Sequence, residues 1–210
     1  MERGSSINIQ DMKLEAYEHN HRTYTPSYAI DTSDKNEYLN LVNDKLFIEK
    51  NNKLGKYEKI DFEKIQSIFE DRHKETTKRT AQKSIKWFKE AVVNTNHTTT
   101  MEQLQKLSKV LQNEFNVMPL DIAHHKDEGY IDDQGNKNIN YHCHIIFVNA
   151  DKNGITKKWD KAELRKLQTR VAEILEMARG QDKRISGNRR LEHKEYKKYI
   201  NEVNELKKQN

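Results

Sequence analysis

The sequence predicts an α+β domain in which helices pack on a sheet. Two observations support this class. Two apolar, strand-like segments, 120–125 and 141–150, flank the turn-forming sequence DDQGN, and apolar residues recur at helical spacing elsewhere in the chain. We therefore expect the two strands to pair as a long antiparallel hairpin that helices cover.

The elements before this hairpin follow from local spacing. The chain up to about Tyr57 is polar and too weakly periodic to place elements. A helix is expected from about Asp61, because apolar residues recur at helical spacing after it, and a short second helix is expected over 77–84. The segment KEAVVN, residues 89–94, is typical of a strand, because its valines are β-branched and polar turn residues follow.

Two further helices are indicated by residues at their ends. Thr99 and Glu102 have the spacing of a capping box ahead of three periodic leucines, and Pro119 is expected to close that unit. Asp160 is expected to cap the last helix, and Gly180 stands where a glycine commonly ends one.

Composition limits the class of protein. The 210 residues suit one domain, expected over 1–190, with a charged helical extension over 191–210 that could be the truncation point of a longer protein. The net charge of +5 is a mild basic bias that permits nucleic-acid binding without demanding it. A single cysteine, Cys143, fits a reducing compartment, and no apolar run reaches membrane length. We therefore expect a cytoplasmic protein without membrane insertion.

The candidate metal ligands are histidines in the predicted hairpin. His142 and His144 are two residues apart on a strand and therefore project from the same face, with Cys143 on the other. The partner strand ends in His124 and His125, one of which should lie beside the pair. Three neutral imidazoles leave coordination positions open, and imidazole suits Zn, Mn, Co or Ni.

Two polar segments could add reactive groups to such a site. Glu128 follows His124 and His125 closely in the chain, and it could orient a metal-binding histidine or accept a proton. Near the N-terminus, EHNHRTYTPSY offers His19 and Tyr24 as nucleophiles for a phosphodiester, and Arg22 as a guanidinium that suits phosphate.

These motifs, in this order, form a resemblance. HNHR, HKDEG and NYHCHIIF look like the motifs of HUH relaxases, in particular plasmid mobilisation proteins of the Mob/Pre (MobV-like) type, over most of the chain. The resemblance implies a mainly antiparallel sheet with helices on its faces. It also implies site-specific nicking of one DNA strand at an origin of transfer, with covalent attachment to the 5′ end.

The resemblance also assigns residues. It selects His125, rather than His124, to bind the metal with His142 and His144, and it places Glu128 in the acid position. The divalent ion is then expected to be Mn or Mg, with Zn, Co or Ni as alternatives. The connection of 129–141 between Glu128 and the His-x-His pair is longer than the usual Mob/Pre pattern.

The nucleophile and the DNA contacts are also assigned by resemblance. His19 matches the Mob/Pre nucleophile and Tyr24 is the alternative, because many other relaxases use tyrosine. The expected partners are single-stranded and hairpin DNA at the origin of transfer, together with coupling or accessory mobilisation proteins. The candidate DNA-contacting residues are Asn20, Arg22, Lys157, Lys158, Arg189 and Arg190.

Two other functions use the same residues. The HUH site could serve a replication initiator or a transposase. Alternatively, the histidines could hold a structural metal in a non-catalytic nucleic-acid-binding module. A structural site is usually closed by four protein ligands, whereas three are found here.

Overall fold

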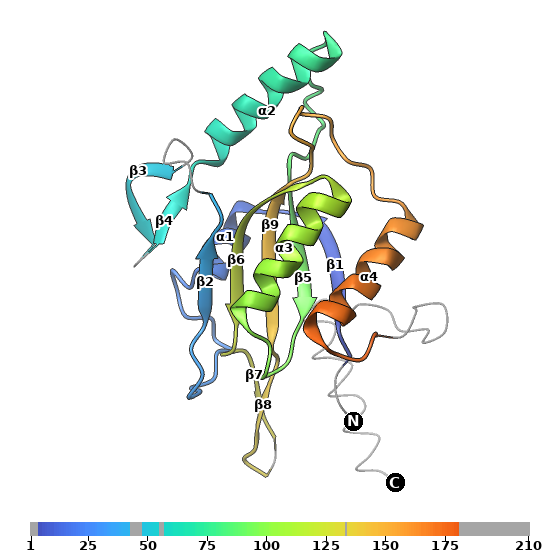
Figure 1. The fold of residues 1–210 in the computed structure, drawn as a ribbon. Coiled ribbons are helices and arrows are strands. Elements are labelled where there is room, and N and C mark those ends of the chain that lie inside the picture. The colour runs from blue at the N-terminus through green and yellow to red at the C-terminus, as the bar shows by residue number, and fades with distance from the viewer. Residues whose placement is uncertain (1–3, 43–47, 55–56, 133, 181–210) are drawn as a thin grey trace, which may run out of the picture. The chain divides into compact units, whose positions relative to one another are not determined.

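The computed structural model describes residues 4–42, 48–54, 57–132 and 134–180, and a five-stranded antiparallel sheet lies at its centre (Figure 1). The strand order is β1-β5-β9-β6-β2. The strands are β1 Ser6–Asp11, β2 Glu37–Asn40, β5 Phe88–Asn94, β6 Met118–His125 and β9 His142–Val148. The predicted α+β class and the antiparallel pairing of the two histidine strands are confirmed.

Two small antiparallel ribbons lie outside this sheet. The first pairs β3 (Ile48–Leu54) with β4 (Tyr57–Ile60). The second pairs β7 (Gly129–Ile131) with β8 (Lys137–Ile139) and forms the connection between β6 and β9. The predicted long hairpin is thus two paired strands of the main sheet joined by a smaller hairpin of their own.

One face of the sheet is covered by α3 (Met101–Phe115) and α4 (Lys161–Leu175), as Figure 1 shows. Alternate residues of the central strands supply this core, so Cys143 and Ile145 pack with the leucines of α3. Cys143 faces away from the adjacent histidines, as the strand alternation predicts.

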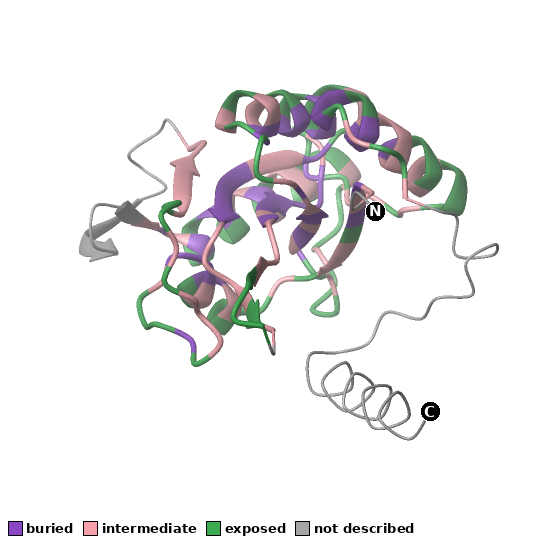
Figure 2. Ribbon diagram, turned by 90° about the horizontal axis from the view of Figure 1, so that it is seen from below, coloured by how far each residue is buried: buried purple, intermediate pink, exposed green. Residues whose placement is uncertain are grey.

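The opposite face supports the histidines and is covered by α1 (Leu14–Asn20) and the start of α2 (Phe62–Thr77). Figure 2 shows the buried residues gathered on the sheet and on the inner sides of the helices. Tyr17 is buried, and its hydroxyl accepts a hydrogen bond from the backbone N–H of Ile60. This contact ties the short α1 to β4, and Tyr17 belongs to the same apolar cluster as Ile146 of β9.

Some predicted boundaries are correct and others are wrong. Asp61 does cap α2, because its side chain accepts a hydrogen bond from the Lys64 N–H. The short helix over 77–84 is wrong: α2 ends at Thr77, because Lys78 takes the left-handed conformation at φ 59°.

The predicted caps of the later helices are displaced. The capping box before α3 uses Thr100 and Gln103, one residue beyond the predicted pair. Thr99 is buried, and its hydroxyl hydrogen-bonds to Asn96 in the preceding turn, so it is engaged elsewhere. Asp160 caps α4 as predicted, and its box is completed by Glu163.

The expected ends at Pro119 and Gly180 are also wrong. Pro119 lies inside β6, at a register shift in its pairing with β9. The last helix ends at Leu175, because Glu176 takes the left-handed conformation, and Gly180 instead approaches Ser5. A Cβ at position 180 would lie 2.7 Å from the Ser5 carbonyl oxygen, which explains the glycine.

The predicted charged extension over 191–210 lies outside the described residues, and so does the predicted domain boundary. Among the helices that the structure describes, none combines the length and the apolar character needed to cross a membrane.

We expect Thr100→Ala to lower the free energy of unfolding by about 1 kcal/mol, because the substitution removes the capping side chain of α3. Thr169→Ala, in the middle of α4, is the control and should leave stability within about 0.5 kcal/mol. Urea denaturation measures both variants, and an unchanged midpoint for Thr100→Ala would contradict the assigned cap.

Candidate metal and nucleophile site

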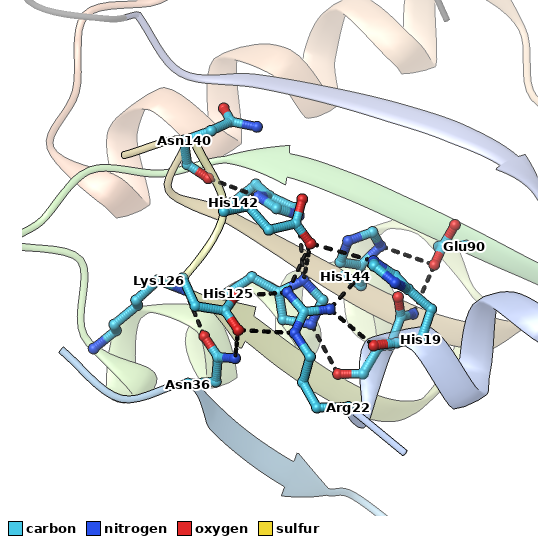
Figure 3. Close-up of polar contacts among 12 residues, drawn as sticks. His19, Arg22, Asn36, Glu90, His125, Lys126, Asn140, His142 and His144 are labelled. Atoms are coloured by element: carbon cyan, nitrogen blue, oxygen red, sulfur yellow. Dashed lines mark hydrogen bonds and ion pairs between the residues drawn. The ribbon is translucent and has the colours of Figure 1, made fainter. Parts of the chain in front are cut away.

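Three histidines from neighbouring strands converge on one point. His125 pairs directly with His142 in the β6–β9 register, and His144 follows on the same face. The ring centroids of the three lie 4.9–5.0 Å apart, in a near-equilateral triangle (Figure 3). His124 pairs with Cys143 and so belongs to the opposite face, which is why it is outside this cluster.

Each of these rings has one nitrogen engaged by an oxygen acceptor. His125 Nε2 lies 2.8 Å from the Asn20 carbonyl, His142 Nδ1 lies 2.7 Å from the Asn140 carbonyl, and His144 Nδ1 lies 2.9 Å from Glu90 Oε1. A carbonyl or carboxylate accepts only from a protonated nitrogen, so these contacts fix the tautomer of each neutral ring. The lone pair is then on the nitrogen that faces the cluster.

The inward nitrogens suit a cation. The candidate ligand atoms of the three rings all lie within 4.8 Å of one another. His125 Nδ1 and His142 Nε2 are only 3.3 Å apart, and buried His144 Nε2 has no hydrogen-bond partner among the described residues. Lone pairs that face each other at this distance repel unless a positive ion lies between them. The donor set therefore fits a divalent metal ion with open coordination positions.

Burial keeps these imidazoles neutral. Loss of solvent lowers the pKa of His142 to about 4, and it lowers the pKa values of His125 and His144 in the same direction. Because a metal binds only the deprotonated nitrogen, the three rings are ready to bind at neutral pH without first losing a proton.

Glu128 lies at the edge of this cluster. Its Oε1 is 3.3 Å from His125 Nδ1, 3.2 Å from His19 Nε2 and 2.7 Å from Arg22 Nη2. Burial alone would raise the pKa of Glu128, but its contacts with His125 and His19 outweigh this effect and hold the pKa well below its usual range. An ionised carboxylate therefore links the three-histidine cluster to the N-terminal motif.

The last turn of α1 places His19 beside the three-histidine cluster. Its ring centroid lies 5.6 Å from that of His125 and 6.4 Å from that of His144. His19, His125 and Glu128 form a second group of close ligand atoms, and this group shares His125 with the first. The tautomer evidence favours the three-histidine set, because His19 lacks such a fixed tautomer.

Arg22 is held by several contacts within the protein. Its Nε and Nη2 form a two-pronged contact with Asp127, Nη2 also donates to Glu128, and Nη1 donates to the His19 carbonyl. Oxygen atoms thus accept four of the five N–H donors of the guanidinium. Arg22 therefore positions Glu128 and His19, and the phosphate contact expected from the sequence stays a prediction.

Asn36 and Asp127 support this arrangement but were not among the residues predicted from the sequence. Asn36 donates to Asp127 and accepts from the Lys126 N–H, so it fixes the segment that presents Glu128 (Figure 3). Asp127 could have been proposed from the sequence, because it directly precedes Glu128 in the motif HKDEG. Asn36 lies in the weakly periodic N-terminal part, and nothing in the sequence indicates its contacts.

Glu90 was also missed. It is buried on β5 and accepts hydrogen bonds from His144, Asn20 and Gln10. Burial alone would raise its pKa, but the bonds from His144 and the two amides lower the pKa to about 2. A glutamate inside the apolar strand KEAVVN was the available signal, because a buried carboxylate needs such partners.

Two of the predicted DNA-contacting residues, Asn20 and Lys157, have partners within the protein. Asn20 has no exposed surface, and it holds Glu90 and His125 rather than facing solvent. Lys157 pairs with Glu163 and lies 4.9 Å over the Trp159 ring, which packs on the α3–α4 side of the sheet, away from the histidines. Both side chains thus have partners within the protein, and DNA contacts at these two residues stay predictions.

Lys158, in the same segment, is exposed, and a DNA contact there stays a prediction. The predicted contacts Arg189 and Arg190 lie outside the described residues. Tyr24 is 53% exposed, with its ring centroid 6.3 Å from that of His19, so it borders the site without contacting the cluster.

No family model and no curated protein matches the chain. Two solved structures do. Both are of the MobM relaxase domain (MOBV; Mob_Pre) bound to plasmid pMV158 oriT DNA, in Mn-bound crystals at pH 6.8 and pH 6.5. The TM-scores are 0.58 and 0.56 at 17% identity, and the matches cover 94% and 93% of this chain and 100% and 97% of those chains. The chain therefore has the fold of the MobV-like relaxase domains that its motifs resemble.

Proposed function

We propose that the chain is a DNA relaxase that nicks one strand at a plasmid origin of transfer, acting in the cytoplasm during conjugative mobilisation. The observation that supports this proposal most is the position of His19, beside an open cluster of three neutral imidazoles. A structural metal site is usually closed by a fourth protein ligand, and it does not require a nucleophile beside it. The relaxase-like fold supports the same choice.

The proposed reaction is a transesterification. A ring nitrogen of His19 attacks the scissile phosphorus, so that an N–P bond forms and the P–O3′ bond breaks. The leaving oxygen takes a proton from solvent and becomes a free 3′-hydroxyl, and the 5′ end of the DNA stays attached to the protein. The N–P bond is energy-rich, so the step can be reversed without an external energy source.

The chain's own residues prepare this step. Glu128 accepts a hydrogen bond from His19 and favours the positive charge that grows on its ring as the bond forms. Arg22 holds Glu128 and the end of α1 in place. His125, His142 and His144 would hold the divalent ion, Mn or Mg in our proposal, which when bound neutralises charge on the phosphate oxygens.

Covalent attachment tests the proposal. Single-stranded oligonucleotides tiled across the replicon that encodes the chain are incubated with the protein and Mn²⁺, then resolved in SDS. We expect one oligonucleotide to give a slower-migrating, SDS-stable adduct, and a shorter DNA product with a free 3′-hydroxyl. If no adduct forms across the tiled set with either Mn²⁺ or Mg²⁺, the non-catalytic binding module becomes the better explanation.

We expect Glu90→Gln to weaken Mn²⁺ binding by about 10- to 100-fold, the usual loss when a residue that orients a metal-binding histidine is changed. The neutral amide no longer holds the proton on His144 Nδ1 as firmly, so the tautomer that directs Nε2 inward is less favoured. Calorimetric titration measures the affinity. Glu37→Gln, which removes a carboxylate next to His124 on the other face, is the control. Equal affinities for wild type and Glu90→Gln would contradict this role.

A further inference from the structure

The β7–β8 ribbon, residues 129–139, connects directly to the candidate site at both of its ends. Glu128 precedes β7, and the Glu128 carbonyl accepts a hydrogen bond of 2.6 Å from the Asn140 N–H, after β8. The Asn140 carbonyl in turn engages His142 Nδ1. The base of the ribbon is thus continuous with a cluster histidine and with the carboxylate that contacts His19.

The described residues of the ribbon, 129–132 and 134–139, belong to neither core. None of its described residues is buried, and Figure 2 draws most of it as exposed. Its geometry is nevertheless specific, because a Cβ on Gly129 would lie 2.2 Å from the Asn138 carbonyl oxygen. Lys137 ties the ribbon to the Asp31 carbonyl, and Ala29 forms a bridge with Glu128. The ribbon therefore lies alongside the segment that follows the His19 motif.

Two large apolar side chains are exposed on this ribbon. Tyr130 is 61% exposed and Ile131 is 59% exposed, and because they are adjacent on a strand they project from opposite faces. Tyr24, also exposed, lies near His19 on the chain segment that leads to Ala29. Aromatic surface is therefore present on both chain segments that border the candidate site.

The chemistry of the ribbon favours contact with bases rather than with phosphates. Its sequence contains two aspartates and one lysine, so it does not form a cationic surface. The Asp132 carboxylate is occupied by the backbone N–H groups of Gln134 and Asn136, and the Lys137 amine by the Asp31 carbonyl. Tyr130 adds an exposed aromatic side chain, and an aromatic face stacks on any unpaired base.

The exposed apolar surface of the ribbon suits a single base better than a protein partner. Such an interface buries about 800 Å² on each side, whereas a tyrosine side chain supplies only about 150–250 Å². One tyrosine and one isoleucine fall well below that area. A single nucleobase, by contrast, is about the size of one aromatic ring.

We infer that the β7–β8 ribbon is a DNA-contacting wedge in which Tyr130 stacks on an unpaired base next to the scissile phosphate. Ile131 projects from the opposite face of the ribbon. This inference rests on the proposed function, because the proposed function places the DNA strand beside His19 and the three-histidine cluster. It adds a contact that reads no sequence and that holds the strand in its single-stranded form.

The test is binding of a fluorescein-labelled, mixed-sequence, single-stranded 30-mer, followed by anisotropy at several salt concentrations. We expect Tyr130→Ala to weaken binding roughly 5- to 150-fold, the loss that one base–aromatic stack gives, with an unchanged slope of log K against log salt. Tyr130→Phe keeps the ring and should bind like wild type. Because Tyr130 is outside both cores, Tyr130→Ala should keep the melting temperature and Mn²⁺ affinity of the wild type.

Three results would overturn the inference: wild-type affinity in Tyr130→Ala, an equal loss in Tyr130→Phe, or a change in the salt slope. A concentration-dependent dimer that Tyr130→Ala abolishes would overturn it too, in favour of an interface between copies. Binding that depends on Tyr130 without any covalent adduct would contradict the proposed nickase and leave the wedge standing. An adduct that forms with full binding in Tyr130→Ala would contradict the wedge alone.

Discussion

His19→Ala is expected to abolish the covalent DNA adduct, whereas Tyr24→Phe should form it at the wild-type level. His19 lies against Glu128 and the three-histidine cluster, and alanine at this position removes the proposed nucleophile. Tyr24 is at the rim, and its hydroxyl has no described contact with the cluster. The measurement is the yield of SDS-stable adduct with the reactive oligonucleotide.

A separate measurement of oligonucleotide binding distinguishes a loss of the chemical step from a loss of DNA affinity. His19→Ala should still bind the same oligonucleotide, because the substitution removes a reacting group and leaves the cluster residues intact. An adduct of normal yield in His19→Ala, together with its loss in Tyr24→Phe, would transfer the nucleophile to the tyrosine. If both single variants keep the adduct, the reacting atom lies elsewhere in the chain.

His142→Ala is expected to remove both metal binding and nicking. Each ring supplies one of three inward nitrogens, and loss of one leaves too few ligands to hold the ion firmly. In wild type, Mn²⁺ at about 100 times its dissociation constant should stabilise the fold by about 2.7 kcal/mol. For a chain of this size that corresponds to a rise in melting temperature of about 5–11 °C.

The variant should show no such rise with Mn²⁺, and EDTA should leave its melting temperature unchanged. His97→Ala is the matched control, because His97 is exposed and outside the cluster. It should keep the full shift. A wild-type response in His142→Ala would mean that the ion binds at another place.

The sequence predicted the centre of the site because strand alternation is a strong constraint. Alternation placed His142 and His144 on one face and left either His124 or His125 as their neighbour. The resemblance to Mob/Pre proteins selected His125, and the strand register confirms that His125 pairs with His142. The same alternation contained the signal for Glu90, but a lone carboxylate in a strand does not name its partners. Its role became visible only when Asn20 and His144 were found beside it.

The N-terminal part could not be predicted in the same way. Helix α1 has only seven residues, and it is held by tertiary contacts such as that of Tyr17 rather than by its own periodicity. Arg22 takes a positive φ of 52°, a conformation that no spacing rule indicates. The carboxylate partners of Arg22 could not be predicted either, because Asp127 and Glu128 lie far from it along the chain.

Lys157 illustrates a different limit. A lysine in a polar connection is usually solvated, and in a DNA-binding protein it is readily assigned to phosphate. Here its stem and charge fold back onto Trp159 and Glu163, where the lysine covers apolar surface near the start of α4. The choice between these two uses depends on the three-dimensional path of the connection, which local sequence does not encode.

The most direct test of the account is the position of the ion itself. Crystals of the chain grown with Mn²⁺, measured on both sides of the manganese absorption edge, should give one anomalous peak bounded by His125 Nδ1, His142 Nε2 and His144 Nε2, with His19 beside it. A peak elsewhere, or none at saturating Mn²⁺ with the three rings still converging, would contradict the claim that these imidazoles form a metal centre.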